Sequence, residues 1–224
     1  MGATRRAADT IARAAGLASD GDFATEVMAA VASVLPHDGY CLFGVDPASR
    51  IRTFMLSRHG LDGVAARLTH NETVERDVNR YSDLAAAAMP AGLLGGNGSR
   101  DVPSPRLNEI LRPAGVRSEL RLGLGTPSTW WGGLSLFRAG RRRPFAPPDV
   151  QVAADIAGAL SQAVRCRPLR SMPSNPAMLP PGVVLLDPSD NVVSMTTEAR
   201  AWLEDLCAGG SDETTVEDVM RVLY

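Results

Sequence analysis

The sequence predicts an α+β fold in which an antiparallel sheet is flanked by helices and followed by a smaller strand-and-helix segment. Four short runs rich in apolar and aromatic residues come in two pairs, and each pair is joined by a short turn. This arrangement is typical of antiparallel hairpins. Segments with apolar residues at helical spacing precede the first pair and follow the second. Terminal helices of this kind cover one face of a sheet.

Two helices are expected at the N-terminus, over residues 3–17 and 22–35. Asp20 or Asp22 can cap the second helix, and Pro36 ends it because proline lacks the backbone N–H that a helix needs. The apolar residues of this second helix recur at helical spacing: Phe23, Val27, Ala30, Val31, Val34 and Leu35.

The two strand pairs follow at a distance from each other. The first pair is expected over residues 40–46 and 51–57, and the second over residues 118–125 and 130–140. Short turns, "PASR" and "TPST", join the members of each pair.

A helical insert separates the two pairs and is expected to cover the other face of the sheet. Residues 71–88 look helical, residues 89–103 form a Gly/Pro-rich loop, and residues 105–112 form a short helix. After the second pair, residues 149–167 form a long helix with a broad apolar face.

The chain is expected to have two parts joined by a linker. Residues 1–170 form the first domain, the Pro-rich stretch 171–181 is the linker, and residues 182–224 begin a smaller segment. That segment reads as a β-hairpin, a helix over residues 198–206 and a helical start at the C-terminus. It is too small to bury a core alone, so we expect either docking on the first domain or, preferably, a chain cut from a longer one.

Composition excludes several classes of protein. The chain has 224 residues, 45% of them hydrophobic and 21% charged, which excludes a disordered protein. All 23 basic residues are arginine, and residues 1–170 carry a net charge of +5 against −7 for residues 171–224. Neither balance is typical of a dedicated DNA-binding domain.

The cysteines and the apolar runs indicate a reduced, cytoplasmic protein with no membrane segment. Cys41, Cys166 and Cys207 lie far apart, with no Cys-x-x-Cys or Cys/His spacing. The N-terminus lacks the apolar core of a signal peptide, and no run of about 18 apolar residues occurs. No metal and no cofactor are expected.

Several motifs, taken in order, resemble a known sensor family. The stretch 104–124 "SPRLNEILRPAGVRSELRLGL", the strand "WGGLSLFR" and the helix start "PFAPPDV" are similar to the GAF sensor domain of actinobacterial LuxR-type transcriptional regulators, as is 35–49 "LPHDGYCLFGVDPAS". In such regulators a PAS-like segment follows, which residues 182–206 resemble, and a helix-turn-helix domain ends the chain. Here no helix-turn-helix occurs before Tyr224, and Ala146 stands where a Ser or Thr cap is frequent.

This resemblance implies the sensory portion of a bacterial transcription regulator. A small-molecule effector or a partner would change the packing of the terminal helices, and DNA would be bound only through a domain absent from this chain. The alternative is a freestanding ligand-binding or dimerisation module with no DNA output. A homodimer is expected through the Ala-rich terminal helices, with the alternative that these helices only cover the sheet.

An enzyme is not expected, because no nucleophile, base and metal set converges. His37, His59 and His70 lie near turns, and none has metal-ligand spacing to another histidine or a cysteine. Ser135 lacks the nucleophile-elbow motif and lies within a strand.

A small-molecule pocket is expected between the sheet and the insert, as in GAF-like folds. Strand alternation places polar and apolar side chains on the face below the insert, and the insert can add two more. The candidate pocket residues are Cys41, Phe43, Asn79, Tyr81, Arg121 and Ser135. The alternative is that these faces are only core, with Arg121 and Glu119 paired.

The triplet Arg141–Arg143 lies between the last strand of the sheet and the long helix, so its charges are expected to be solvated. Two other roles stay open for it, which are docking of the acidic segment 171–224 and direct contact with DNA.

Overall fold

The computed structural model describes residues 2–17, 19–96, 103–126, 128–171, 182–187 and 192–208. It divides the chain into two compact units, Met1–Ser171 and Met172–Tyr224.

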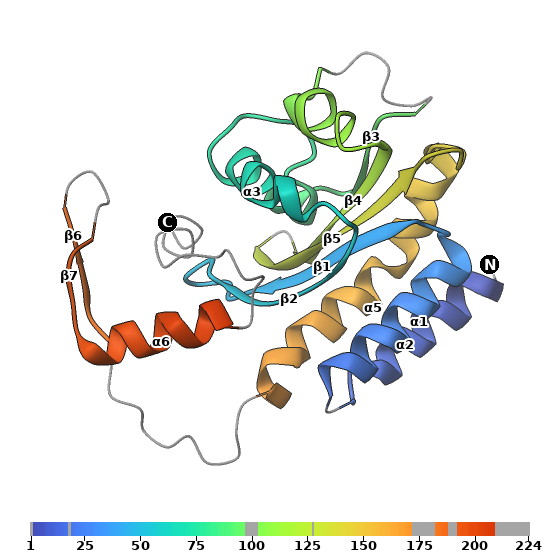
Figure 1. The fold of residues 1–224 in the computed structure, drawn as a ribbon. Coiled ribbons are helices and arrows are strands. Elements are labelled where there is room, and N and C mark those ends of the chain that lie inside the picture. Colours follow the sequence, from blue (N-terminus) through green and yellow to red (C-terminus); the bar gives the residue numbers. More distant parts are fainter. Residues whose placement is uncertain are drawn as a thin grey trace. The chain divides into compact units, whose positions relative to one another are not determined.

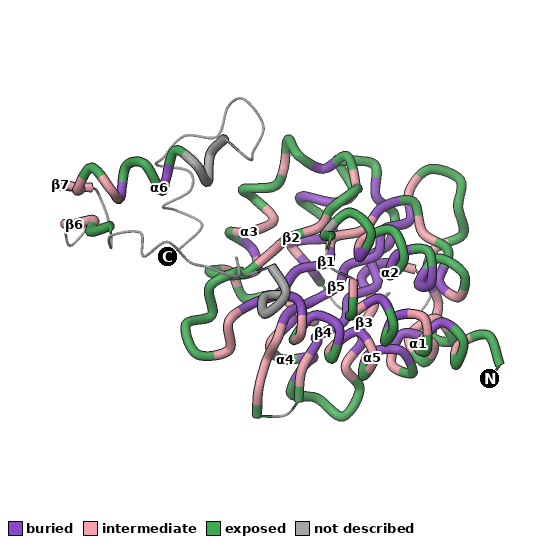
Figure 2. The backbone as a smooth tube through the Cα atoms, turned by 90° about the horizontal axis from the view of Figure 1, so that it is seen from below, coloured by how far each residue is buried: buried purple, intermediate pink, exposed green. Residues whose placement is uncertain are grey.

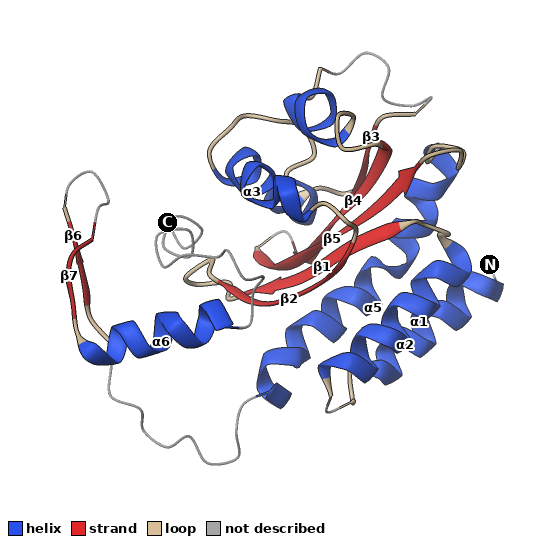
Figure 3. Cartoon of the chain, viewed as in Figure 1, coloured by secondary structure: helices blue, strands red, loops and turns tan. Residues whose placement is uncertain are grey.

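The first unit is built on a five-stranded antiparallel sheet with the order β2-β1-β5-β4-β3 (Figures 1 and 3). The predicted α+β class, an antiparallel sheet flanked by helices, is therefore confirmed. Both predicted hairpins form, with β1 next to β2 and β4 next to β5. The strands are β1 (Gly39–Val45), β2 (Arg52–Arg58), β3 (Ala91–Leu94), β4 (Val116–Thr126) and β5 (Thr129–Ala139).

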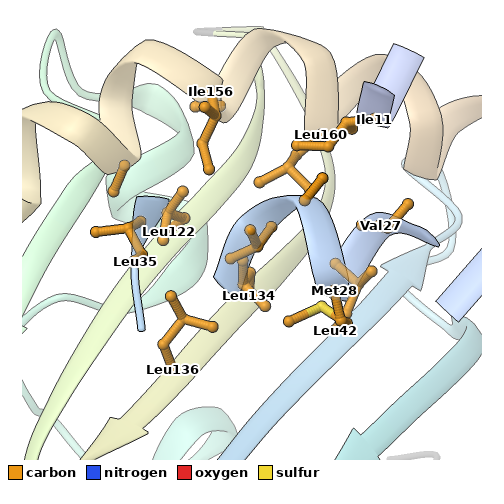
Figure 4. Close-up of a cluster of buried hydrophobic side chains, with 14 of the residues drawn as sticks. Ile11, Val27, Met28, Leu35, Leu42, Leu122, Leu134, Leu136, Ile156 and Leu160 are labelled. Carbon is orange, nitrogen blue, oxygen red and sulfur yellow. The ribbon is translucent and has the colours of Figure 1, made fainter. Parts of the chain in front are cut away.

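Three long helices cover one face of this sheet, as Figure 1 shows. They are α1 (Gly2–Ala14), α2 (Asp20–Val34) and α5 (Pro147–Ser171). The largest apolar cluster lies between these helices and the sheet, and Figure 4 shows part of it. Figure 2 shows the central strands as buried. Fully buried members of this cluster include Ile11, Val27, Leu42, Leu122, Leu134, Ile156 and Leu160.

The described residues between β2 and β4, 59–96 and 103–115, are called the insert; apart from β3, which is the edge strand of the sheet, they cover the other face (Figure 1). Besides β3, the insert contains η1 (Asp62–Val64), α3 (Ala65–Thr73), α4 (Tyr81–Ala86) and the π-helical turn η2 (Arg106–Leu111). Two smaller apolar clusters lie on this face, one of them around Phe43 and Tyr81.

The insert differs from its prediction in two places. A single helix over residues 71–88 is wrong, because α3 ends at Thr73 and Asn79 adopts a left-handed backbone with φ 58° before α4 begins. The predicted loop 89–103 contains β3, which pairs with β4 across a long sequence separation. A Cβ at Gly92 would collide with the Asn79 side chain, so the close approach of the two segments depends on glycine there.

A bulge near the start of β5 reverses the expected positions of the two tryptophans. Gly132 has φ 153°, and the β4–β5 register shifts between Leu124 and Gly125. Trp130 therefore packs with Phe43 below the insert, whereas Trp131 packs against the helix-covered core. Without the bulge, strict alternation from Ser135 would place Trp131, and not Trp130, on the face below the insert.

The start of α5 has a cap that the sequence pattern did not reveal. The Asp149 carboxylate, inside the first turn, accepts the Ala146 backbone N–H at 2.8 Å, which is the bond that the third helical residue contributes to a capping box. All three residues of the Arg141–Arg143 triplet are exposed, as expected, and Arg142 forms an ion pair with Asp38 at 2.7 Å.

The second unit contains the predicted hairpin and helix. Strand β6 (Val184–Leu186) pairs with β7 (Val192–Met195), and α6 (Thr197–Ala208) follows. The linker was predicted over residues 171–181, and Ser171 is instead the last residue of α5. The rest of the predicted linker and the helical start at residues 216–224 lie outside the described residues. Within the described ranges, no helix is long and apolar enough to cross a membrane.

Candidate functional site

Three of the predicted pocket residues form a row across three neighbouring strands. Ser135 on β5 is the register partner of Cys41 on β1 and of Arg121 on β4. The leucines that alternate with them, Leu120 and Leu136, point to the helix-covered core. Strand alternation thus brings a thiol, a hydroxyl and a guanidinium together on the face below the insert.

Tyr81, the first residue of α4, lies directly on this row. Its hydroxyl is 2.6 Å from the hydroxyl of Ser135, and the Arg121 guanidinium lies 4.0 Å from its ring centroid. The ring of Phe43 meets the Tyr81 ring edge to face, with the centroids 4.8 Å apart. Any Cβ at Gly133 would collide with both rings, so this glycine gives Tyr81 its place on the sheet.

Arg121 is a fully buried cation with open hydrogen-bond donors. Its Nη2 donates to Oε2 of Glu72, and its Nε lies 3.8 Å from Oε1 of Glu119, beyond hydrogen-bond distance. Neither Nε nor Nη1 has a hydrogen-bond partner among the residues that the structure describes. Burial alone would lower the pKa of Arg121, but Tyr81, Glu119 and Glu72 raise it above the usual value, so the group stays charged.

Glu119 is held mainly by a different arginine, Arg106 of η2. Arg106 Nε and Nη2 donate to the two carboxylate oxygens at 2.7 and 2.9 Å, and the Ser135 hydroxyl donates to one of them. Burial alone would raise the pKa of Glu119, but Arg106 and Arg121 together hold it below the usual value. Glu119 therefore has two arginine partners. The expected pair with Arg121 is the longer contact, at 3.8 Å, and the pair with Arg106 is the shorter, at 2.7 Å.

Asn79 and Cys41, which were also predicted to line the pocket, are not part of the hydrogen-bonded cluster. Asn79 donates from its amide to the Leu93 carbonyl at 3.0 Å, which fastens the insert to β3 instead of offering a free polar group. Cys41 is half-buried and packs against both insert-side clusters, and burial raises the pKa of its thiol.

Two important members of the site, Arg106 and Glu72, were missed from the sequence, and Glu119 was considered only as a partner of Arg121. A charged residue within an otherwise buried strand, such as Glu119, does signal a buried partner. Nothing in the local pattern points to Arg106 or Glu72, because both come from the insert and meet the sheet only in the tertiary structure. The short helix that carries Arg106 was expected over residues 105–112 and forms over Arg106–Leu111, whereas the boundaries of the helix that carries Glu72 were mispredicted.

A separate pocket of about 240 Å³ lies on the helix side of the molecule. Small and polar residues of α1 and α2 line it: Ala3, Arg6, Ala7, Thr10, Ala30 and Ser33. It contains no member of the buried polar cluster.

His59 and His37 bond to nearby backbone, and His70 Nε2 lies 3.7 Å from Oε1 of Glu75. Nδ1 of His59 accepts the Leu61 N–H at 2.9 Å, and Nδ1 of His37 lies 2.9 Å from the Leu35 carbonyl oxygen. Burial lowers the pKa of both histidines. In the part of the chain that the structure describes, no group of three or more His, Cys, Asp or Glu side chains is placed to hold a metal ion.

The site can therefore offer a guanidinium, two hydroxyls and aromatic rings to a small polar ligand. Glu119 is fully engaged by Arg106 and Ser135, so it is not poised to accept a proton from a substrate.

Comparison with known proteins gives a limited result. No family model matches the chain, and no curated protein matches it. Among solved structures, the chain is similar to the photoproduct state of GAF3 from Slr1393 of Synechocystis sp. PCC6803. The match has 18% sequence identity and a TM-score of 0.45, and it covers 66% of this chain and 94% of that one.

Proposed function

We propose that the Met1–Ser171 unit senses a small molecule between its sheet and its insert, as the sensory portion of a LuxR-type transcription regulator. The observation that carries this proposal is Arg121, a buried guanidinium whose Nε and Nη1 have no hydrogen-bond partner in the described part of the chain. The sequence resemblance to the GAF domains of such regulators supports the regulatory context.

A buried donor without a partner lowers the stability of the folded protein, by about 1–3 kcal/mol for each group. A leucine or methionine on β4 would fill the same space without that penalty. Small-molecule sites combine an apolar lining with a few converging polar groups, and Arg121, Tyr81 and Ser135 supply these groups here. Ligand binding is a physical reason for the penalty to be tolerated.

The fold offers a route from this site to the helices. Arg121 lies on the insert face of β4, whereas its neighbours Leu120 and Leu122 pack below α5 on the opposite face. A small shift of β4 therefore changes the packing of α5, which also packs against α1. In this mechanism the ligand shifts the population between two packings of the helices, and it catalyses no reaction.

A fusion experiment tests the regulatory role. The full chain is joined to the N-terminal domain of a phage repressor, which binds its operator only as a dimer, and a metabolite library is screened for changed reporter expression. We expect at least one compound that changes expression and also raises the melting temperature of the purified chain. A compound that stabilises the chain but never alters its self-association or the reporter would contradict signalling.

The alternative is a freestanding ligand-binding or dimerisation module. The two are distinguished by examining the native reading frame beyond Tyr224 for a helix-turn-helix coding sequence. If the frame encodes no such domain, the chain is a freestanding module.

A further inference from the structure

We infer that the ligand of the insert-side site is a small organic monocarboxylate with an apolar or aromatic body, and that its carboxylate replaces Glu72 on Arg121. This inference rests on the proposed ligand-binding function and specifies its chemistry. Four observations support it: the geometry of the guanidinium, the charge of the cluster, the aromatic lining and the position of Glu72.

The geometry of the guanidinium makes Glu72 the competitor of any such ligand. A carboxylate binds arginine best through two parallel N–H donors. The Cδ atom blocks the edge between Nε and Nη1, so both edges that present two parallel donors include Nη2. Glu72 occupies Nη2. Nη2 has two hydrogens, one on each of these edges, so a carboxylate on the edge nearer Glu72 must take its place. A carboxylate on the other edge would put a second negative charge beside Glu72 on the same guanidinium, so exchange with Glu72 is favoured over addition.

The charges around Arg121 select a monoanion. The buried cluster contains two guanidiniums, Arg106 and Arg121, and two carboxylates, Glu72 and Glu119. If Glu72 moves away, Glu119 still neutralises Arg106, and one positive charge stays on Arg121. A single carboxylate restores the balance, whereas a neutral ligand leaves a buried cation without a partner.

The surroundings of Arg121 suit an apolar body. Tyr81 stacks on the guanidinium, Phe43 meets the Tyr81 ring, and Trp130 meets Phe43 with ring centroids 6.4 Å apart. These three rings lie on the same face of the sheet as Val45. An aromatic or branched aliphatic acid would place its carboxylate on Arg121 and its body among these rings.

Glu72 is the most exposed of the residues that pair with Arg121 or Glu119 here, and it also links α3 to the start of α4 by a hydrogen bond. Its side chain is 14% exposed, against 0% for the side chains of Arg121 and Glu119. Its second oxygen, Oε1, accepts the backbone N–H of Tyr81 at 3.0 Å. Displacement of Glu72 therefore loosens the start of α4 at the same time as it opens the site, which couples ligand binding to movement of the insert.

The test uses the full chain with benzoate as the probe and benzamide as its uncharged analogue. Calorimetric titration at constant ionic strength and neutral pH measures both affinities for the wild type, Glu72→Gln and Glu109→Gln. A glutamine at position 72 can still accept the Tyr81 N–H but no longer competes as a charge. We expect Glu72→Gln to bind benzoate about tenfold or more tightly than the wild type, because a charge-assisted pair is freed.

Glu109→Gln is the matched control, since this exposed insert carboxylate pairs with Arg67 and not with Arg121. It should leave benzoate affinity unchanged, and benzamide should bind weakly to all three proteins. Unchanged or weaker benzoate binding by Glu72→Gln overturns the inference, as does equal binding of benzoate and benzamide. Arg121→Met should abolish benzoate binding. If this variant does not fold, the change in benzoate affinity of Glu72→Gln still tests the inference.

The failure of this inference is distinguishable from the failure of the proposed function. If the reporter responds to an uncharged compound and Glu72→Gln has no effect on benzoate binding, the sensory function is supported and the carboxylate ligand is rejected. If benzoate binds tightly but the reporter does not respond, the carboxylate site is supported and the signalling role is rejected.

Discussion

The hydroxyl of Tyr81, on α4 of the insert, lies 2.6 Å from the hydroxyl of Ser135, in the middle of the sheet. Ser135 in turn donates to Glu119, whose carboxylate is also bound by Arg106 of η2. A continuous buried chain of hydrogen bonds therefore joins two separate elements of the insert through one strand pair. The insert is held by polar contacts as well as by apolar packing.

This chain predicts energetic coupling between Tyr81 and Ser135. Tyr81→Phe and Ser135→Ala should each lower the free energy of unfolding by about 1–2 kcal/mol, because each leaves a buried polar group with fewer partners. The double variant should be less destabilised than the sum, with a coupling energy of about 1 kcal/mol. Urea unfolding measures all three variants. Simple additivity would show that the bond contributes nothing.

Acid should weaken the insert through Glu119. The pKa of Glu119 is lowered in the folded protein, below its ordinary value of 4.5. Its stabilising effect is therefore complete above that value and is lost as the pH falls through the lower, folded pKa. At neutral pH, Glu119→Gln should destabilise the protein by about 3–5 kcal/mol, because Arg106 is left buried without its counter-charge.

The difference between wild type and Glu119→Gln should shrink as the pH falls below about 4.5, the ordinary value for this side chain. Chemical unfolding at a series of pH values measures it. Glu109→Gln, at an exposed carboxylate on the same insert, should show neither effect. A pH-independent difference would mean that the charge of Glu119 does not stabilise the fold.

The contact of α4 with β4 should depend on Gly123. A Cβ at this position would collide with the backbone of Tyr81 and Ala85, which cannot move without displacing α4. Gly123→Ala should cost about 1–3 kcal/mol by overpacking. Gly158→Ala is the control, because a Cβ at this position in α5 meets nothing within 4 Å. It should be stabilising by about 0.5–1 kcal/mol through helix propensity, and thermal unfolding distinguishes the two.

The cysteine on β1 should be protected from alkylation. Cys41 and Cys166 are both half-buried, but Cys41 packs in the apolar clusters below the insert, where burial raises the pKa of its thiol, whereas Cys166 lies near the end of α5. Iodoacetamide at neutral pH should therefore modify Cys41 more slowly than Cys166, as measured by peptide mass spectrometry. In urea the two rates should converge. Equal rates in the native protein would place Cys41 at an open surface.

Local pattern determined much of this molecule. The period of two in a strand, and the alternation of Leu120 and Leu122 with Glu119 and Arg121, assigned the face below the insert correctly. The row of Cys41, Ser135 and Arg121 follows from that alternation once the strands pair. The terminal helices were also found, because amphipathic spacing depends only on neighbouring residues.

Only the tertiary structure decided which side chains pair with one another in the site. Glu72 meets Arg121 from 49 positions away along the chain, and β3 exists because β4 offers it an edge. The helix expected over residues 71–88 gives way to two short helices, because the contacts of Glu72, Asn79 and Tyr81 with the sheet outweigh local helical preference. Such contacts depend on how the chain closes on itself, which no local pattern of residues encodes.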